Sequence, residues 1–200
     1  MHQGPGDRPE VALTYDDGPG TSTAAVLELL EHHGARATFF MVGSEVERDP
    51  DLAREVMAAG HEIGSHSMHH LDHAQVTPGE AVADMVAGAQ AIADRLGFEP
   101  RLYRAPYGRF VPETVAEADR RGWTCVHWSA LGEDWDASAT ARSVTDCILP
   151  DLQPGAIILL HDSRRAKQMN PEPVTGATAL LLEGLAHRGL HSRAVSEIMR

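Results

Sequence analysis

The chain has 200 residues, of which 42% are hydrophobic and 23% charged, so it suits one globular domain but is short for two. Its formal net charge of −12, with no dense run among the 17 Lys and Arg residues, argues against nucleic acid or an anionic membrane surface as partner. No apolar run approaches the roughly 20 residues that span a bilayer, so no membrane span is expected.

The first residues, Met1–Pro9, are polar and rich in Gly and Pro, without the apolar stretch of a secretory leader. We expect residues 1–10 to form a flexible lead segment and residues 11–200 to form the domain. As the chain is written, we expect a cytoplasmic protein. If a leader has been trimmed, a secreted protein is the alternative.

Strands and helices are predicted to alternate along the rest of the chain. Apolar, β-branched or aromatic runs predict strands at Val11–Tyr15, Ala37–Val42, His61–Gly64, Leu102–Arg104, Thr124–Trp128, Ala156–Leu160 and His191–Val195. Capping residues, Gly and Pro predict helices from Thr21 to Gly34, Asp49 to Gly60, Thr77 to Gly97, Pro112 to Gly122, and Thr175 to about Gly189. This alternation predicts parallel strands joined by crossover helices, in an open doubly wound sheet or a barrel.

Two cysteines, Cys125 and Cys147, are too few for a disulfide framework and too far apart in sequence for a close zinc-binding pair. Free cysteine is among the most buried residue types. We therefore expect both side chains to be buried apolar groups.

Polar groups suited to metal binding and acid/base chemistry follow the predicted strands. In chain order they are Asp16 and Asp17, His66 and His70, Arg104, Asp134, and His161. The C-terminal strand ends of parallel α/β folds form the face where active sites are built, so we expect these residues to converge. Two imidazoles four residues apart and one carboxylate make three metal ligands that leave positions open for water and substrate. The pattern indicates a catalytic metal site rather than a structural one.

These motifs, in this order, resemble those of the polysaccharide deacetylases, the NodB-homology enzymes of carbohydrate esterase family 4. The resemblance spans about residues 11 to 195 and rests on Tyr15–Pro19, Ala37–Phe40, Gly60–His66 with His70, Arg104–Gly108, Asp134-Trp135 and Ile158–Asp162. It implies an α/β fold, a distorted (β/α) barrel of seven to eight parallel strands. It also implies a metal-dependent hydrolase that removes acetyl groups, usually from N-acetylated amino sugars.

The resemblance assigns a metal set and a catalytic base. Asp17, His66 and His70 would bind one divalent metal, with zinc the first choice and cobalt, nickel or iron able to occupy the same ligands. Asp16 would be the general base, oriented by Arg104. Hydrolysis of an acetamide needs both a Lewis acid and a base for the water's proton, so dividing the adjacent aspartates in this way is chemically reasonable.

The remaining roles concern the leaving group and the substrate. By resemblance, His161 protonates the leaving nitrogen and Asp134 holds the imidazolium, raising its pKa. The substrate-binding residues would be Pro106, Tyr107, Trp135 and Leu159. Among these, the backbone N–H of Tyr107 would stabilise the oxyanion, while Trp135 and Leu159 would wall the acetyl pocket.

Three features of the sequence leave details open. His69 and His73 are also four residues apart, but only the His66/His70 pair matches the family's motif. Leu131 stands where many members carry an aspartate, which leaves the shape and charge of the groove beside the acid open. The basic segment Ser163–Pro173 is either a rim loop that contacts substrate or a simple surface excursion.

Several functions remain open at this point. The first is N-deacetylation of a polysaccharide or a small acetamido sugar by a monomeric enzyme, with an O-acetyl esterase acting on xylan as the alternative. A second is an Fe(II) oxygenase, which two histidines and a carboxylate also suit, although it leaves Asp16, Arg104 and His161 unexplained. The third is a carbohydrate-binding protein with a vestigial site. That reading predicts loss of the base, the acid or a ligand, and none is lost.

Overall fold

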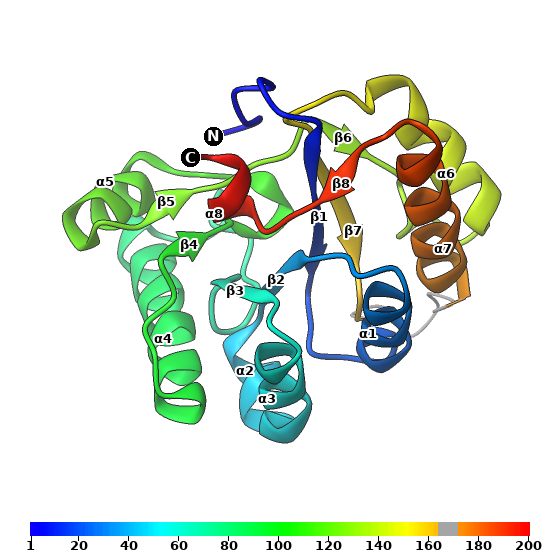
Figure 1. The fold of residues 1–200 in the computed structure, drawn as a ribbon. Coiled ribbons are helices and arrows are strands. Elements are labelled where there is room, and N and C mark those ends of the chain that lie inside the picture. Colours follow the sequence, from blue (N-terminus) through cyan, green and yellow to red (C-terminus); the bar gives the residue numbers. More distant parts are fainter. Residues whose placement is uncertain (164–171) are drawn as a thin grey trace.

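Parallel strands form the centre of the fold in this computed structural model, which describes residues 1–163 and 172–200 (Figure 1). The strands are β1 (Glu10–Asp16), β2 (Ala37–Met41), β3 (Glu62–Ser65), β4 (Leu102–Tyr103), β5 (Thr124–Cys125), β6 (Ala130–Leu131), β7 (Ile157–His161) and β8 (His191–Ser192). Their order is β5-β4-β3-β2-β1-β7-β6, with β8 paired to β1, and every pairing between these strands is parallel. The curled parallel sheet confirms the expected distorted (β/α) barrel.

Helices lie around the outside of the sheet (Figure 1). They are α1 (Thr23–His32), α2 (Gly43–Arg48), α3 (Pro50–Ala58), α4 (Pro78–Leu96), α5 (Pro112–Arg121), α6 (Ala141–Ile148), α7 (Glu172–His187) and α8 (Val195–Ile198), with short 3-10 helices η1 (Pro106–Gly108) and η2 (Leu149–Asp151). The longest, α4, begins at the predicted capping box of Thr77 and Glu80 and ends at Gly97 in a left-handed conformation. Among the described residues, no helix is both long and apolar enough to cross a membrane.

The central strands β1, β2 and β7 are buried on both faces. Leu13, Tyr15, Phe39, Ile158 and Leu160 all belong to one core cluster and are fully buried. One face packs against the crossover helices, and the other packs inside the curled sheet, where Ala12, Phe40 and Ile157 belong to a second core cluster. This continuous burial explains why these strands appear in the sequence as apolar runs, and it gives a rigid support for the polar residues at their C-terminal ends.

The structure differs from the sequence prediction mainly in short elements. The helices α2, α6 and α8 and the strand β6 were not predicted, and β5 and β8 are each shorter than expected. The last long helix starts at Glu172, before the predicted Thr175. The unpredicted and shortened elements have only two to eight residues each, so their form is decided by packing against the sheet rather than by a readable period.

The expectation that both cysteines are buried is wrong. Cys125 is half-buried in β5, at one end of the sheet, and Cys147 is exposed. Cys147 lies on the unpredicted helix α6, which turns Val144 and Ile148 toward the core instead. An amphipathic helix leaves one side to solvent, so burial here depends on the residue's place around the helix axis.

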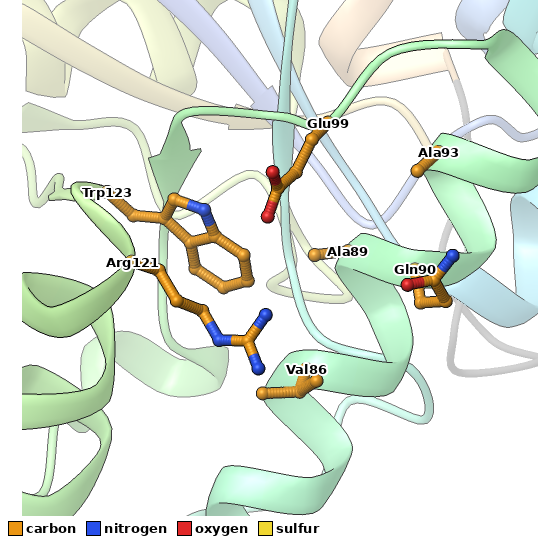
Figure 2. Close-up of a pocket in the computed structure, with 7 residues that line it drawn as sticks. All are labelled: Val86, Ala89, Gln90, Ala93, Glu99, Arg121 and Trp123. Atoms are coloured by element: carbon orange, nitrogen blue, oxygen red, sulfur yellow. The ribbon is translucent and has the colours of Figure 1, made fainter.

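A pocket of about 200 Å³ lies between α4 and the end of α5 (Figure 2). Its lining residues are Val86, Ala89, Gln90, Ala93, Glu99, Arg121 and Trp123. The indole Nε1 of Trp123 is buried and has no hydrogen-bond partner among the described residues. None of the strand-end residues Asp16, Asp17, His66, His70, Arg104, Asp134 and His161 lines this pocket.

Replacing Gly88 with alanine is expected to destabilise the protein by about 1–3 kcal/mol. Gly88 lies on α4, where a Cβ would stand 2.2 Å from the backbone carbonyl carbon of Ser67. Because this neighbour is backbone, the loop after β3 would have to shift. The matched control is Gly79→Ala on the same helix, since nothing lies within 4 Å of a Cβ there. Urea denaturation should separate the two variants, and equal stabilities would contradict the close contact.

Candidate metal centre and active site

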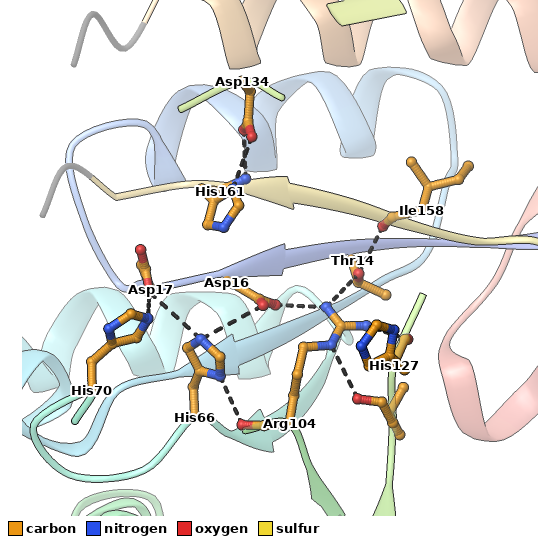
Figure 3. Close-up of polar contacts among 11 residues, drawn as sticks. Thr14, Asp16, Asp17, His66, His70, Arg104, His127, Asp134, Ile158 and His161 are labelled. Carbon is orange, nitrogen blue, oxygen red and sulfur yellow. Dashed lines mark hydrogen bonds and ion pairs between the residues drawn. The ribbon is translucent and has the colours of Figure 1, made fainter. Parts of the chain in front are cut away.

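The strand-end residues predicted to converge do meet at the C-terminal ends of the parallel strands (Figure 3). Asp16 and His161 are direct neighbours in the register between β1 and β7. Arg104 follows β4, and His66 follows β3, which pairs with β4. Segments separated by up to 145 positions in the sequence, from Asp16 to His161, are therefore brought side by side by parallel pairing.

Three potential ligands form a compact cluster. One ligand atom from each of Asp17, His66 and His70 lies within 4.8 Å of the others. Oδ1 of Asp17 is 3.1 Å from Nε2 of His70 and 3.6 Å from Nε2 of His66. Asp17 and His70 both have positive φ, 76° and 56°, which turns their side chains toward the same point at a cost in backbone strain.

The imidazole of His66 is oriented by the backbone. Its Nδ1–H donates to the carbonyl oxygen of Arg104 at 2.8 Å, which leaves the lone pair of Nε2 facing the two aspartates. Burial lowers the pKa of His66 to about 4, with help from His70 and against the pull of Asp16 and Asp17. The neutral ring at ordinary pH is the form that binds a metal.

The donor atoms of the cluster suit a metal ion. Oδ1 of Asp17 is buried and makes no hydrogen bond of good geometry among the described residues. Burial by itself would raise the pKa of Asp17, but the contact with His70 and the charges of His161 and His66 outweigh it and hold this pKa far below its usual value. A carboxylate oxygen and two imidazole nitrogens aimed at one point are a common donor set for zinc and related metals.

Asp16 is held by a buried arginine. Nη1 of Arg104 donates to Oδ1 of Asp16 at 2.6 Å and to Oγ1 of Thr14 at 2.8 Å, while Oδ2 of Asp16 is 3.6 Å from Nε2 of His66. The Arg104 side chain is fully buried, its guanidinium lies over the ring of Phe40, and Nη2 donates to the carbonyl of His127. One carboxylate oxygen is thus fixed, and the other faces the cluster.

A second carboxylate–imidazole pair, Asp134 and His161, lies at the end of β7, next to Asp16 at the end of β1. Asp134 accepts from Nδ1 of His161 at 2.8 Å and from its backbone N–H at 2.7 Å. Burial would lower the pKa of His161, but the charge and hydrogen bond of Asp134, with smaller contributions from Asp17 and Asp16, raise it to about 9. The ring is therefore a cation at neutral pH, with a proton on both Nδ1 and Nε2.

The predicted substrate residues lie around these groups. The ring of Trp135 meets that of His161 edge-on at 5.4 Å, and the ring of Tyr107 meets that of His70 at 4.7 Å. Both aromatic side chains are substantially exposed, whereas Pro106 and Leu159 are buried. Tyr107 has a positive φ of 57° within η1. Of the predicted rim segment Ser163–Pro173, residues 164–171 lie outside the described residues, and its last two belong to α7.

The competing histidine pair does not form a second cluster. His73 is buried, its Nδ1 lies 3.1 Å from the hydroxyl of Tyr103 on β4, and its Nε2 lies 3.5 Å from Oδ2 of Asp84 on α4. Among the described residues, the only group of three that could hold a metal ion contains His66 and His70. The structure therefore favours His66 and His70, the pair that matches the family's motif.

One buried carboxyl beside the site received no role from the sequence. Asp162 accepts from Oγ1 of Thr23 at 2.5 Å, and burial, together with the charges of Asp17 and Asp16, raises its pKa to about 7. A Cβ on Gly18 would stand 2.4 Å from its carboxyl oxygen, so the loop carrying Asp17 runs directly over it. The adjacent His161-Asp162 letters were the available signal, but only contacts reveal which side each residue faces.

Comparisons with known proteins agree with this geometry. Residues 3–126 match the family model described as polysaccharide deacetylase. A peptidoglycan-N-acetylglucosamine deacetylase of Bacillus cereus is 33% identical over 98% of this chain and 91% of its own length. A chitooligosaccharide deacetylase of a Bradyrhizobium species is 38% identical over 76% of this chain and 70% of its own.

The fold is also similar to that of a solved deacetylase. The crystal structure of a peptidoglycan N-acetylglucosamine deacetylase superposes with a TM-score of 0.92 at 27% identity, covering 98% of this chain and 91% of the other. A family match over more than half of the chain, near-complete coverage by a curated relative and a shared fold agree with the strand-end geometry. The chain therefore belongs to the polysaccharide deacetylase family of carbohydrate-deacetylating hydrolases.

Proposed function

We propose that the protein is a metal-dependent N-deacetylase that releases acetate from an N-acetylated amino sugar. The observation that carries the proposal is one cluster of three ligands beside a buried carboxylate, Asp16, and a carboxylate-paired imidazole, His161, which end neighbouring strands. The reactions named for the relatives, removal of acetyl from peptidoglycan N-acetylglucosamine and from chitooligosaccharide, support the same chemistry.

Asp17, His66 and His70 would hold the metal, with zinc as the first candidate and cobalt, nickel or iron as alternatives. When bound, it would supply a Lewis acid at the acetyl carbonyl and lower the pKa of the attacking water. Oδ1 of Asp17, buried and without a good hydrogen bond among the described residues, supports this assignment because a buried carboxylate oxygen needs a partner.

The proton transfers fall to residues of the chain. Asp16 takes a proton from water as the water oxygen bonds to the acetyl carbon. Arg104 fixes Oδ1 of Asp16, so Oδ2 is the basic atom. His161 gives the proton on Nε2 to the amide nitrogen as the carbon–nitrogen bond breaks, and Asp134 holds its Nδ1–H throughout. The products are acetate and a free amine.

The sugar would lie against the exposed aromatic rings. Trp135 and Tyr107 are 43% and 61% exposed although large and apolar, and each contacts a histidine of the site. Aromatic faces of this kind suit the apolar face of a sugar ring. The backbone N–H of Tyr107 is assigned to the oxyanion, and Leu159 and Pro106 to the wall of the acetyl pocket. This open arrangement suits a polymer or a small acetamido sugar.

Chelator-sensitive acetate release is the expected result of the first assay. The panel contains chitooligosaccharides, peptidoglycan fragments, a small N-acetylated amino sugar and acetylated xylan, each tested before chelation, after it, and after adding zinc or cobalt. Release from N-acetyl substrates should disappear with chelator and return with metal. Release from xylan alone would replace the proposal with the esterase. No release from protein with stoichiometric metal would contradict deacetylation of these substrates, and oxygen consumption would then test the oxygenase.

A further inference from the structure

The loop that carries both histidine ligands has a strained backbone. It follows β3, and two of its residues other than glycine, Ser67 and His70, have positive φ values of 63° and 56°. Such conformations cost free energy and persist only where surrounding contacts impose them. The contacts that hold this loop therefore decide whether His70 reaches the metal position.

The two halves of the loop are held by different parts of the fold. His66 is held by the sheet, since its backbone N–H donates to the carbonyl of Met41 at 2.8 Å. Beyond His66, the support comes from α4. The backbone N–H of Met68 donates to the carbonyl of Asp84, and that of His69 donates to Oδ1 of the Asp84 side chain, both at 2.9 Å. Asp84 thus receives two successive N–H groups immediately before His70.

Asp84 is an unusual residue for its position. It is 6% exposed and lies on the face of α4 that also buries Ala81, Met85 and Gly88. Burying a carboxylate is costly unless it is paired. Burial would raise the pKa of Asp84, but its interactions with His73 and Ser67 and with the backbone N–H groups of the loop outweigh this and lower it. The side chain is therefore an anion at neutral pH.

A second buried histidine faces this anion. Nε2 of His73 is 3.5 Å from Oδ2 of Asp84, and its Nδ1 is 3.1 Å from the hydroxyl of Tyr103. Because Nε2 of His73 faces an anionic carboxylate oxygen, this nitrogen carries the ring's proton, and Nδ1 accepts from the phenol of Tyr103. The hydrogen bond from Tyr103 to His73 and the electrostatic contact from His73 to Asp84, which is not a hydrogen bond of good geometry, link β4 and α4 to the loop between β3 and α4.

We propose that Asp84, oriented by His73, is a positioning residue for the metal centre. Its carboxylate fixes the backbone before His70, so that this imidazole meets Asp17 and His66. The inference rests on the proposed metal-dependent function. An apolar residue would fill the same face of α4 without a buried charge, so the carboxylate is explained by what it holds in the loop.

Zinc affinity is the decisive measurement, made on the full chain by competition with a chromophoric chelator. Asp84→Ala should weaken zinc binding by about 10- to 100-fold, as is typical when a residue supporting a metal ligand is lost. Asp84→Asn keeps an acceptor for His69 but loses the charge facing His73, so it should weaken binding by less. The matched control is Ile92→Ala. Ile92 is fully buried on the same helix, and it belongs to the main core cluster, which contains none of the described residues 66–70 of the metal loop.

Ile92→Ala should lower the midpoint of thermal unfolding yet bind zinc like the wild type well below that midpoint. Wild-type zinc affinity in both Asp84 variants would overturn the inference, and so would equal weakening by Ile92→Ala. If Asp84→Ala fails to fold, the zinc affinities of Asp84→Asn and His73→Gln test the inference instead. Wild-type zinc affinity in both of these variants would overturn the positioning role of Asp84. A wild-type protein that binds no zinc would instead contradict the proposed function, which separates the two failures.

Discussion

Asp16→Asn is expected to lower the rate of acetate release by roughly 100- to 10,000-fold, the usual contribution of a general base. The bound metal should stay stoichiometric, because Asn can still accept from Arg104 at the position of Oδ1 and the three assigned ligands are untouched. Removing the charge also leaves the buried Arg104 guanidinium without its counter-ion, so the variant should unfold at a lower temperature. Turnover and metal content should therefore be measured well below that transition.

The contrast with His66→Ala makes the first prediction specific. His66 is an assigned ligand, so its removal should lower metal content and activity together. Both variants change a buried residue on the same face of the sheet, and their metal content by elemental analysis should differ clearly. If Asp16→Asn lost its metal as completely as His66→Ala, Asp16 would be a ligand and the division of the two aspartates would be wrong.

Asp134→Asn is expected to move the alkaline limit of activity to lower pH by about 1–3 units, the usual effect of one neighbouring charge on a pKa. In the wild type, Asp134 raises the pKa of His161 to about 9, so the acid is protonated below that pH and its contribution is lost as pH rises through it. Without a metal His66 becomes protonated near pH 4, so protons should compete with the metal there and activity should be lost as the pH falls to that region. Profiles of kcat against pH test both limits.

A neighbouring acid provides the control for this profile. Asp136 is exposed, two residues from Asp134, and its carboxylate accepts from Ser138. Asp136→Asn should leave the alkaline limit unchanged. An unchanged alkaline limit in Asp134→Asn would show that His161 is not the acid. A rate that still increased as the pH was lowered to 4 would show that neither the base nor a ligand becomes protonated in that range.

The sequence was informative where residue type and order carry the chemistry. Asp17, His66 and His70 could be chosen as ligands before any contact was known, because motif register separates His66/His70 from His69/His73. The buried strands β1, β2 and β7 were also predictable, since parallel strands covered on both faces need continuous apolar runs. Helix α4 could be bounded from its capping box and its final glycine.

The sequence was uninformative about short elements and about side-chain burial that depends on long-range contacts. The helix α6, which exposes Cys147, and the two-residue strand β6 carry too little pattern to be predicted alone. Nothing in the letters around Asp84 distinguishes a buried carboxylate from the solvated acids of α4, such as Asp94. Its burial follows from the approach of the β3–α4 loop, a tertiary contact.

By itself, then, the sequence determined the parallel α/β architecture, the strand ends that carry the polar groups, and the identity of those groups. These follow from local periodicity and from residue chemistry, which the chain carries at every position. Only the tertiary structure decided the protonation and orientation of each group. The tautomer of His66 depends on the carbonyl of Arg104, 38 positions away, and the charge of His161 depends on Asp134, 27 positions away. Such properties arise from burial and from partners distant in sequence, so they exist only once the strands are paired.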